Sequence, residues 1–236
     1  MRAYLLLTPP LDVFDHMALD EAVLEDAARA ALPVFYFRIY NWDKSQPAVT
    51  FGISQKYENV SAAVRDRDGG VTVPLVRRTT GGGIVYHDGD ITFSFVFPWP
   101  HLTAPSLIYK NMHLGVHLGL KMHRIPSRLW SPADKSEAAP AECFAAPVPI
   151  DLVHEDGTKI LGGALRRRKG VGLYQGSMRT EGFGEAREVL LQALQDGFDL
   201  QWRSVFNPVS PEPKVAAAAK QLRLEKYAVE GWNKRR

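Results

Sequence analysis

The sequence predicts an α+β fold in which a mixed or antiparallel β-sheet is flanked by helices. Segments with helical and strand patterns come in blocks rather than in strict alternation, which disfavours a doubly wound parallel sheet. Residues 91–97 carry the clearest strand pattern, with aromatic or aliphatic side chains at odd positions and mostly small polar ones at even positions. A chain of 236 residues is also long enough to bury a substantial core.

The composition limits the class of protein. A single cysteine excludes an intramolecular disulfide framework and a Cys-rich zinc module, and it suits a reducing compartment. No run approaches the 18 or so apolar residues of a membrane span, and the apolar residues 4–7 are too few for a secretory signal. The net charge of +3 is small for a nucleic-acid binder. We therefore expect a cytoplasmic protein with neither a membrane nor a nucleic acid as partner.

The first half of the chain contains one expected helix and several expected strands. Asp15 is a candidate cap for a helix over residues 15–31, and Pro33 ends it. The aromatic and β-branched residues 34–40 predict a strand, and residues 47–52 predict a short second one. Because Asp88-Gly89 is a turn dipeptide, residues 84–87 and 91–97 are expected to pair as a hairpin.

The second half begins with an expected helix over residues 107–122. His113 and His117 lie four apart on it, but no third ligand is evident, so we expect a packed or exposed pair and no metal site. Residues 126–149 contain five prolines and little periodicity, which is typical of a lid, a binding loop or a disordered segment. Three short strands and two closing helices are expected after this loop, at residues 151–153, 159–165, 171–175, 186–198 and 215–227.

An arginine pair followed by three glycines is the most unusual local sequence. The segment reads Arg77-Arg78-Thr79-Thr80-Gly81-Gly82-Gly83 and lies between two strand-like stretches. Consecutive glycines add no packing, so they indicate unusual dihedrals or a close approach of the backbone to a ligand. Backbone N–H groups there could hold a phosphate or an acyl oxygen, although a flexible bend explains the glycines equally well. The spacing matches neither a P-loop nor a dinucleotide fingerprint.

Two further residues are candidates for chemistry. Lys159 enters a glycine-flanked strand and could face a pocket, or it could be an ordinary exposed edge lysine. Cys143, within the proline-rich loop, is by its sequence context alone more typical of an inert thiol than of a nucleophile.

Taken together, these segments resemble the lipoate–protein ligase and octanoyltransferase family, which shares its fold with biotin–protein ligases. The first matching motif comprises Arg77, Arg78, Gly81, Gly82, Gly83, Val85, His87 and Asp88. The second comprises Lys159, Ile160, Gly162 and Ala164, followed by Arg166-Arg167 and Gly176-Ser177. Matches at residues 40–42, 50–52, 226–227 and 232–233 extend the resemblance over nearly the whole chain, and we expect residues 1–236 to form one catalytic domain with no C-terminal accessory domain.

The resemblance implies attachment of an octanoyl or lipoyl group to a lysine of a lipoyl domain or of the glycine-cleavage H protein. It implies that Lys159 stabilises carbonyl charge, and that the loop Gly81–Gly83 seats the acyl head group. Arg77 and Arg78 are expected to approach a phosphate, and His87 and Asp88 to fix the surrounding hairpin. Gly162, Gly163 and Ala164 are expected to bind substrate, while apolar strand residues near Phe93 and Ile160 line the acyl chain.

Cys143 favours one of two chemistries known in this family. The pair Cys143-Phe144 resembles the segment around the catalytic cysteine of one octanoyltransferase branch, which implies a thioester on Cys143 and no cofactor. The alternative is an ATP- and Mg²⁺-dependent lipoate ligase that forms an acyl-adenylate, with or without a separate accessory subunit, and in which Cys143 takes no part. A non-catalytic lipoate- or carrier-binding protein is a third reading, suggested by two departures from the family pattern, at Leu165 and Gln175.

The resemblance also implies the partners. We expect acyl carrier protein or an H protein as donor, and a lipoyl domain or an H protein as acceptor. These partners are acidic, so the resemblance gives the basic clusters at residues 77–78, 166–169 and 234–236 a role in binding them. A monomer is the simplest expectation. Gly163 is a third departure, because the family commonly has serine at this position. Together with Leu165 and Gln175 it leaves the choice between octanoate and lipoate open.

Overall fold

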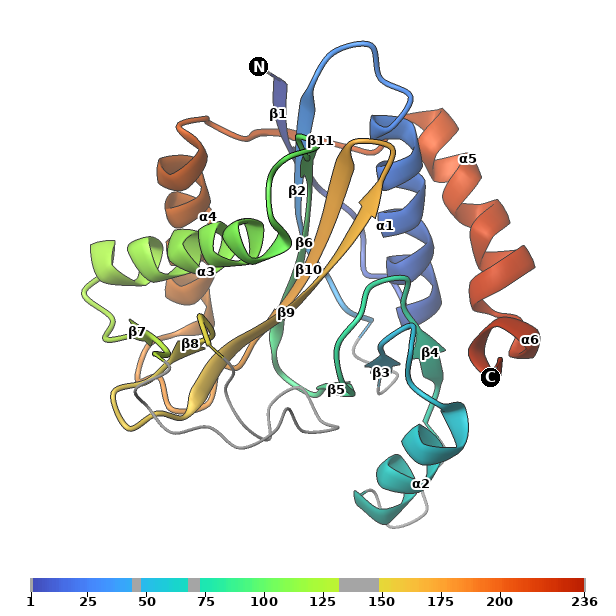
Figure 1. Cartoon of the computed structure of the whole chain (residues 1–236), viewed down its shortest axis with the longest axis horizontal. Helices are drawn as coiled ribbons and strands as arrows, with labels where there is room; N and C mark the ends of the chain where they lie inside the picture. The colour runs from blue at the N-terminus through green and yellow to red at the C-terminus, as the bar shows by residue number, and fades with distance from the viewer. Residues whose placement is uncertain (1, 44–47, 68–72, 132–148, 236) are drawn as a thin grey trace.

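The computed structural model describes residues 2–43, 48–67, 73–131 and 149–235. Within these ranges the strands form two sheets, one large and one small, and helices cover both faces of the large sheet (Figure 1). No helix among the described residues is long and apolar enough to cross a bilayer.

The large sheet is mixed. Its order is β11-β1-β2-β6-β10-β9-β8-β7. The bounds are β1 Arg2–Leu6, β2 Val34–Ile39, β6 Ile91–Pro98, β7 Arg128–Leu129, β8 Leu152–Val153, β9 Lys159–Arg168, β10 Val171–Met178 and β11 Asn207–Val209. Strand β1 pairs in parallel with β2 and β11, and the remaining neighbours are antiparallel. The predicted α+β class with a mixed sheet is therefore confirmed.

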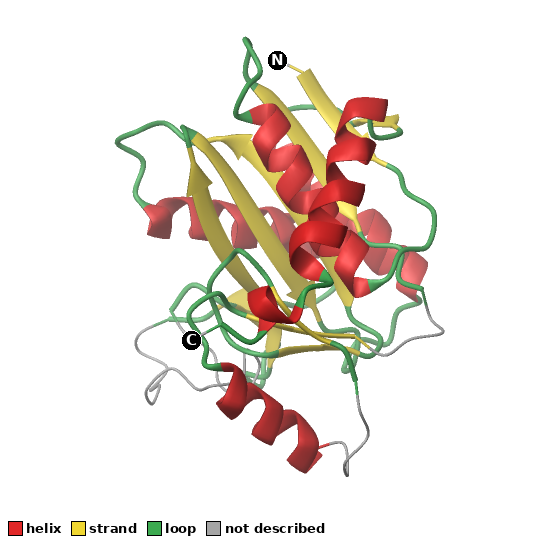
Figure 2. Ribbon diagram, turned by 90° about the vertical axis from the view of Figure 1, so that its right-hand side faces the viewer, coloured by secondary structure: helices red, strands yellow, loops and turns green. Residues whose placement is uncertain are grey.

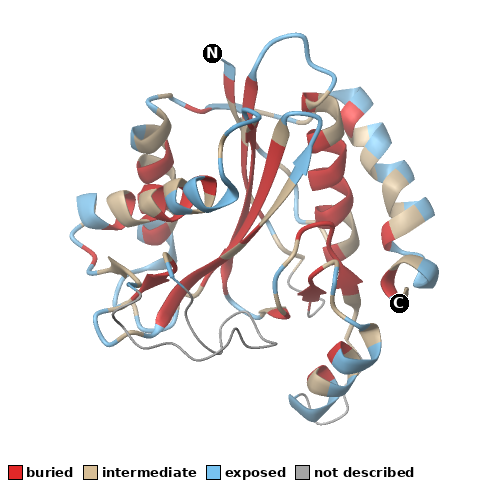
Figure 3. Ribbon diagram, viewed as in Figure 1, coloured by how far each residue is buried: buried red, intermediate tan, exposed pale blue. Residues whose placement is uncertain are grey.

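Two pairs of helices cover the large sheet. On one face, α3 (Pro105–Met122) packs with α4 (Arg187–Trp202), and on the other α1 (Val13–Ala27) packs with α5 (Pro213–Leu222). Figures 1 and 2 show the sheet between these two layers. The buried surfaces face inward from both layers (Figure 3), so each face of the sheet has its own apolar cluster.

The alternation of β6 determines what each face of the sheet contains. Phe93 and Phe95 point toward α4, where their rings lie 5.5 and 5.2 Å from that of Phe198. Thr92 and Ser94 point to the other face, toward α1. Because successive strand residues alternate between faces, the aromatic core and the polar side chains are separated by one strand.

The small sheet has the order β4-β3-β5, with bounds Leu75–Arg77, Ala48–Phe51 and Val85–His87. The helix α2 (Tyr57–Arg67) packs against it. The expected hairpin of residues 84–87 and 91–97 is wrong, because β5 pairs with β3 whereas β6 pairs with β2 and β10. Gly89, at φ +130°, lies in the turn that carries the chain from the small sheet to the large one.

The remaining differences from the sequence prediction are local. Asp12 rather than Asp15 caps α1, since its carboxylate accepts the N–H of Asp15. Strands β1, β7 and β11 and helix α2 were not predicted, and β7 lies within the expected loop. The last expected helix, residues 215–227, is divided into α5 and a π-helical turn over Arg223–Tyr227. A further helix, α6 (Glu230–Asn233), follows it and brings the C-terminal segment against β4.

Candidate active site

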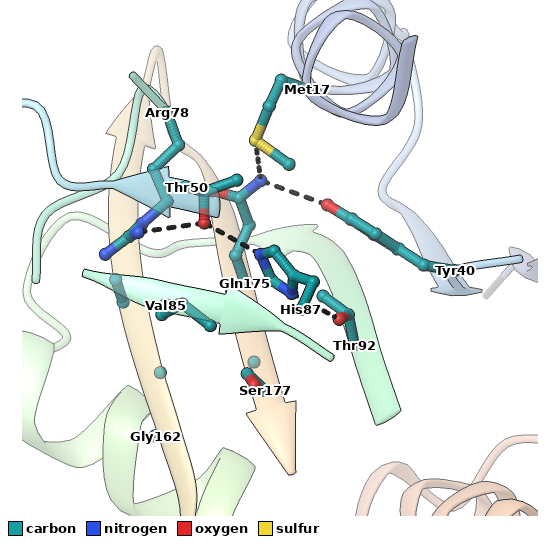
Figure 4. Close-up of a pocket in the computed structure, with 13 residues that line it drawn as sticks. Met17, Tyr40, Thr50, Arg78, Val85, His87, Thr92, Gly162, Gln175 and Ser177 are labelled. Atoms are coloured by element: carbon teal, nitrogen blue, oxygen red, sulfur yellow. Dashed lines mark hydrogen bonds between the residues drawn. The ribbon is translucent and has the colours of Figure 1, made fainter. Parts of the chain in front are cut away.

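A cleft lies between the small sheet and the α1-facing side of the large sheet (Figure 4). Its empty volume is about 380 Å³ when the open solvent at its mouth is included. The walls come from α1, β3, β5, β6, β9 and β10, so elements from both halves of the chain build it. The polar positions of β6 and β10 form its floor because they alternate with core residues on the opposite face.

Arg78 forms one wall and is bonded to the glycine loop, whose residues Gly81–Gly83 do not themselves line the cleft. The guanidinium of Arg78 donates to the carbonyl of Gly81 at 2.7 Å, to that of Gly83 at 2.7 Å and to Oγ1 of Thr50 at 3.2 Å. The side chain is buried, and it lines the cleft. Arg78 therefore places a cation at the cleft and holds the loop by its carbonyl oxygens.

Close backbone approach explains two of the glycines. A Cβ on Gly52 would lie 2.0 Å from the carbonyl oxygen of Gly82, so β3 and the loop could not approach each other with any other residue at position 52. Gly82 itself has φ +85°, a region that favours glycine. On its other side it lies beside Ala164 of β9, which lines the cleft.

Asp20 of α1 is a buried carboxylate that organises the floor. It accepts hydrogen bonds from Arg38, Tyr40, Ser94 (2.6 Å) and Gln175 (2.7 Å). Burial together with the Asp20 charge raises the pKa of the Tyr40 hydroxyl well above its usual value, so that hydroxyl remains a donor.

Gln175 links this carboxylate to the glycine loop. Its Oε1 accepts the hydroxyl of Thr80 at 2.6 Å, and its Nε2 donates to Asp20 and to the Tyr40 oxygen. Since an ionised carboxylate only accepts, the amide orientation is fixed. The departure from the family pattern at Gln175 is therefore an integrated part of the cleft floor.

The residues of the first sequence motif have different environments. His87 lines the cleft, whereas Asp88 points outward and forms an exposed ion pair with Arg67 at 2.9 Å. Arg77 does not line the cleft. Its N–H groups donate to the main-chain carbonyls of Ile53, Gln55, Trp232, Asn233 and Arg235. In this conformation none of its five donors remains for a phosphate, and Arg77 joins the C-terminal segment to β4.

The second motif is divided between the two faces of the sheet. Gly162, Gly163 and Ala164 line the cleft. Lys159 does not line it, and its ammonium lies 2.7 Å from the carboxylate of Asp151, with both side chains buried. Tyr109 of α3 donates to the other oxygen of Asp151 at 2.7 Å. Phe93 and Ile160, the expected lining of the acyl chain, belong instead to the core under α3 and α4.

Gly163 is explained by Tyr174. A Cβ on Gly163 would lie 2.0 Å from the Tyr174 hydroxyl, so a serine at this position would displace the tyrosine. The Tyr174 hydroxyl is hydrogen-bonded to Nε2 of His113 at 2.9 Å.

Cys143 lies on residues 132–148, outside the described residues, so its geometry stays a prediction. The two histidines of α3 have separate partners, Tyr174 for His113 and Ser127 for His117. Among the residues that the structure describes, no group of three or more His, Cys, Asp or Glu side chains is arranged to hold a metal.

Sequence reasoning missed Thr50, Asp20 and Asp90, which are buried polar residues of the cleft region. Asp20 could have been found, because His16 and Asp20 interrupt the apolar side of α1 at a spacing of four. Thr50 lies in the matching segment 50–52, but it resembles any β-branched strand residue, so it was not singled out as a residue of the site.

The whole architecture matches solved structures of lipoate–protein ligases. A lipoate–protein ligase A bound with ATP superposes with a TM-score of 0.79 at 24% identity, covering 99% of each chain. A bipartite lipoate protein ligase from Thermoplasma acidophilum gives 0.75 at 22% identity, covering 99% of this chain and 96% of that one. The fold is therefore that of the lipoate–protein ligase class of enzymes.

Sequence comparison identifies the family. The model of the lipoyl protein ligase A/B catalytic domain matches residues 12–209, and the chain belongs to this family. The chain is 27% identical to the octanoyltransferase LipM of Geobacillus kaustophilus over 94% of each protein. The LipM of Kyrpidia tusciae is 30% identical over 92% of this chain and 81% of its own length. The LipM of Staphylococcus epidermidis is 34% identical over 69% of this chain and 60% of its own.

Proposed function

We propose that this enzyme of protein lipoylation transfers an octanoyl group from a carrier thioester to a lysine of a lipoyl domain or an H protein. The similarity to LipM octanoyltransferases, which in one case spans 94% of both chains, carries the proposal. The acyl group would occupy the cleft beside Arg78, His87 and the glycine loop, whose walls combine small and weakly polar groups.

Cys143 is the proposed nucleophile. Its thiolate would attack the carrier thioester, the carrier thiolate would leave, and an octanoyl thioester would remain on the enzyme. The loop that carries Cys143 begins and ends beside the Asp151–Lys159 pair. The N–H of Trp130 donates to the Asp151 carbonyl at 2.7 Å, and that of Ile150 donates to the Trp130 carbonyl at 3.0 Å. Eight extended residues span about 28 Å, so the segment from Cys143 to Asp151 is long enough for the thiol to reach Lys159.

Lys159 does not line the cleft, so we propose that it stabilises the carbonyl oxygen during the first step, while the Cys143 thioester forms. Asp151 holds the ammonium at the start of β9, and Tyr109 holds Asp151 in turn. A cation fixed in this way needs no reorganisation during the reaction, which is the property that favours transition-state stabilisation. We propose a monomer of one catalytic domain, with acidic carrier and acceptor proteins as partners.

The second candidate function is ATP-dependent ligation, in which ATP and Mg²⁺ activate lipoate and Cys143 takes no part. The specific observation in its favour is that the matching family model covers both the A and the B types. In that case Arg78 would approach the phosphate of the acyl-adenylate, because it is the arginine of the pair that lines the cleft.

One experiment separates the two functions. The purified protein is incubated with octanoyl carrier protein and apo-H protein in the absence of ATP, and intact masses are recorded for the enzyme and the acceptor. We expect an octanoyl adduct on the wild-type enzyme that is absent from Cys143→Ser, followed by modification of the acceptor. A parallel incubation with lipoate, ATP and Mg²⁺ is the control.

Full ATP-dependent transfer by Cys143→Ser, with no transfer from the carrier by the wild type, would establish the ligase instead. An unmodified acceptor under both conditions would contradict both functions and leave a binding protein.

A further inference from the structure

A chain of hydrogen bonds runs from the wall of the cleft to a buried carboxylate. Arg78 donates to Oγ1 of Thr50 at 3.2 Å, and that hydroxyl lies 3.0 Å from Nε2 of His87 (Figure 4). Nδ1 of His87 lies 3.1 Å from Oδ2 of Asp90. Thr50 and His87 line the cleft, whereas Asp90 lies behind them. The arrangement places a hydroxyl, an imidazole and a carboxylate in line at the proposed acyl site.

The two ends of the chain favour one direction. Arg78 can only donate, so Thr50 accepts from it, and the hydroxyl proton of Thr50 is available to donate to His87. Burial alone would raise the pKa of Asp90, but the charge of His87 and hydrogen bonds from His87, Ser177 and Thr92 bring it below its usual value. In the tautomer whose Nδ1–H donates to the Asp90 carboxylate, Nε2 is the acceptor that faces the Thr50 hydroxyl. This is the arrangement of a general base.

Further contacts hold the carboxylate and the imidazole in place. Oδ2 of Asp90 also accepts hydroxyl protons from Thr92 and Ser177, each at 2.6 Å. The Trp42 ring packs 4.6 Å from that of His87. The charged or titratable groups facing His87 are Asp90 of the turn before β6, Arg78 of the cleft wall and His16 of α1. Burial and Arg38 lower the pKa of His16 well below its usual value, so it adds no charge near neutral pH.

The carboxylate end of the chain borders a second cavity. On β5, Val85 and His87 face the cleft, whereas Ile84 and Tyr86 line an outer cavity on the other side of the strand. Asp90 also lines that outer cavity, and its Oδ1 has no hydrogen-bond partner among the residues that the structure describes. The chain therefore extends from the proposed acyl site to the edge of a second, polar cavity.

We infer that Thr50, His87 and Asp90 form a proton relay that deprotonates the acceptor amine during acyl transfer. The inference rests on the proposed function, since a lysine side chain with a pKa near 10.4 must lose a proton before it can attack. The ammonium proton passes through the Thr50 hydroxyl to Nε2 of His87, and the nitrogen lone pair forms the C–N bond. The Cys143 thiolate leaves as the C–S bond breaks, and it takes the second proton of the nitrogen. His87 then releases its proton to solvent, so the step balances as thioester plus ammonium giving amide, thiol and one proton.

The test measures the two half-reactions separately. Wild-type and variant enzymes are loaded from octanoyl carrier protein, and the thioester on Cys143 is quantified by intact mass. Each acyl-enzyme is then mixed with apo-H protein in single turnovers from pH 6.5 to 10. We expect His87→Gln to load normally but to transfer about 10²–10⁴ times more slowly at pH 7, the usual contribution of a general base. The difference in transfer rate between the wild type and His87→Gln should become smaller toward pH 10, because there the amine loses its proton without a base.

Matched variants distinguish a relay from a structural role. Thr50→Val should slow transfer at least about tenfold while Thr50→Ser, which keeps the hydroxyl, restores it, and Asp90→Asn should slow the same step. His123→Gln, the same substitution at a half-buried surface histidine, should leave both steps unchanged. Wild-type transfer rates for His87→Gln at pH 7, or an equal loss at every pH, would overturn the relay.

The proposed function can fail independently. If wild-type Cys143 acquires no thioester, the transfer step is measured from synthetic octanoyl-adenylate. Attack by the amine is common to both chemistries. The relay therefore predicts that the wild type and the variants transfer from the adenylate in the same order of rates, and with the same pH dependence, as from the thioester. Equal rates for the wild type and His87→Gln in this reaction would overturn the relay.

Discussion

At the scale of single residues, buried polar groups with defined partners stabilise this molecule. Asp20 and Arg38 are paired in the interior, as are Asp151 and Lys159, and each carboxylate accepts at least one further hydrogen bond. A buried pair of this kind contributes little net stability, but removing one partner costs about 3–5 kcal/mol because the other charge is left uncompensated. These pairs therefore act mainly by fixing positions around the cleft.

His113 makes the stability of the protein depend on pH. It is fully buried between Tyr109 and Tyr174, and burial together with the Lys159 charge lowers its pKa to about 3. Below about pH 6.5 the unfolded chain binds a proton that the folded one does not, so stability falls as the pH decreases from 6.5 toward 3. The loss is about 1.4 kcal/mol per pH unit, or about 2 kcal/mol at pH 5.

Urea unfolding at pH 7 and pH 5 tests this prediction. In His113→Gln the free energy of unfolding should no longer show the decrease of about 2 kcal/mol at pH 5 that protonation of His113 causes. Tyr174→Phe, which removes the hydrogen-bond partner and keeps the histidine, should retain it. An identical pH dependence in the wild type and in His113→Gln would contradict the assignment.

At the scale of elements, the strand patterns were predictable and their partners were not. The alternation of residues 91–97 correctly separated the aromatic face of β6 from the polar face that forms the cleft floor. The turn at Asp88-Gly89 was also correctly placed, but it joins two sheets rather than two paired strands. A local turn signal defines a change of direction, whereas the hydrogen-bond partner depends on contacts that are distant in sequence.

The same distinction applies to the site. The glycine-loop motif and its resemblance predicted that Arg78, His87 and Gly162 lie near a substrate, and the structure places them around one cleft. Asp20 and Asp90 act through buried hydrogen bonds that connect residues more than 70 positions apart, such as Ser94 with Asp20 and Ser177 with Asp90. The spacing of His16 and Asp20 marks Asp20 as polar on a buried side of α1, but pairings of this range leave no local sign of the partner.

Arg77 provides a prediction at this scale. Its planar guanidinium joins the turn between β3 and α2 and the C-terminal segment to β4 through carbonyl oxygens, and lysine has neither the five donors nor the geometry to replace it. Arg77→Lys should lower the free energy of unfolding by about 2–4 kcal/mol, because several carbonyls lose their partners. Hydrogen exchange at residues 230–235 should also accelerate. Arg67→Lys on the exposed face of α2 is the control, with a change within about 0.5 kcal/mol. Unchanged exchange at residues 230–235 would refute the role of Arg77.

At the scale of the whole molecule, the two sheets share one set of buried interactions. The small sheet contributes Thr50 and His87, whose partner Asp90 is held by Ser177 of the large sheet. Thr80 of the glycine loop is bonded to Gln175, also in the large sheet. The cleft therefore exists only while both sheets are folded, because neither sheet alone satisfies these buried polar groups.

This coupling predicts that the protein unfolds in a single cooperative step. Trp42 lies at the junction of the sheets beside His87, whereas Trp202 packs on the aromatic core under α4, so fluorescence reports on both regions. We expect urea transitions followed by tryptophan fluorescence and by far-UV circular dichroism to coincide. Trp42→Phe and Trp202→Phe, measured separately, should each retain one transition at the same midpoint by both probes. Two midpoints, with the Trp42 signal changing first, would show that the small sheet and the cleft unfold before the core and that the shared interactions do not couple them. A single midpoint instead means that a substitution in the core which lowers global stability also lowers the population of the formed cleft by the same factor.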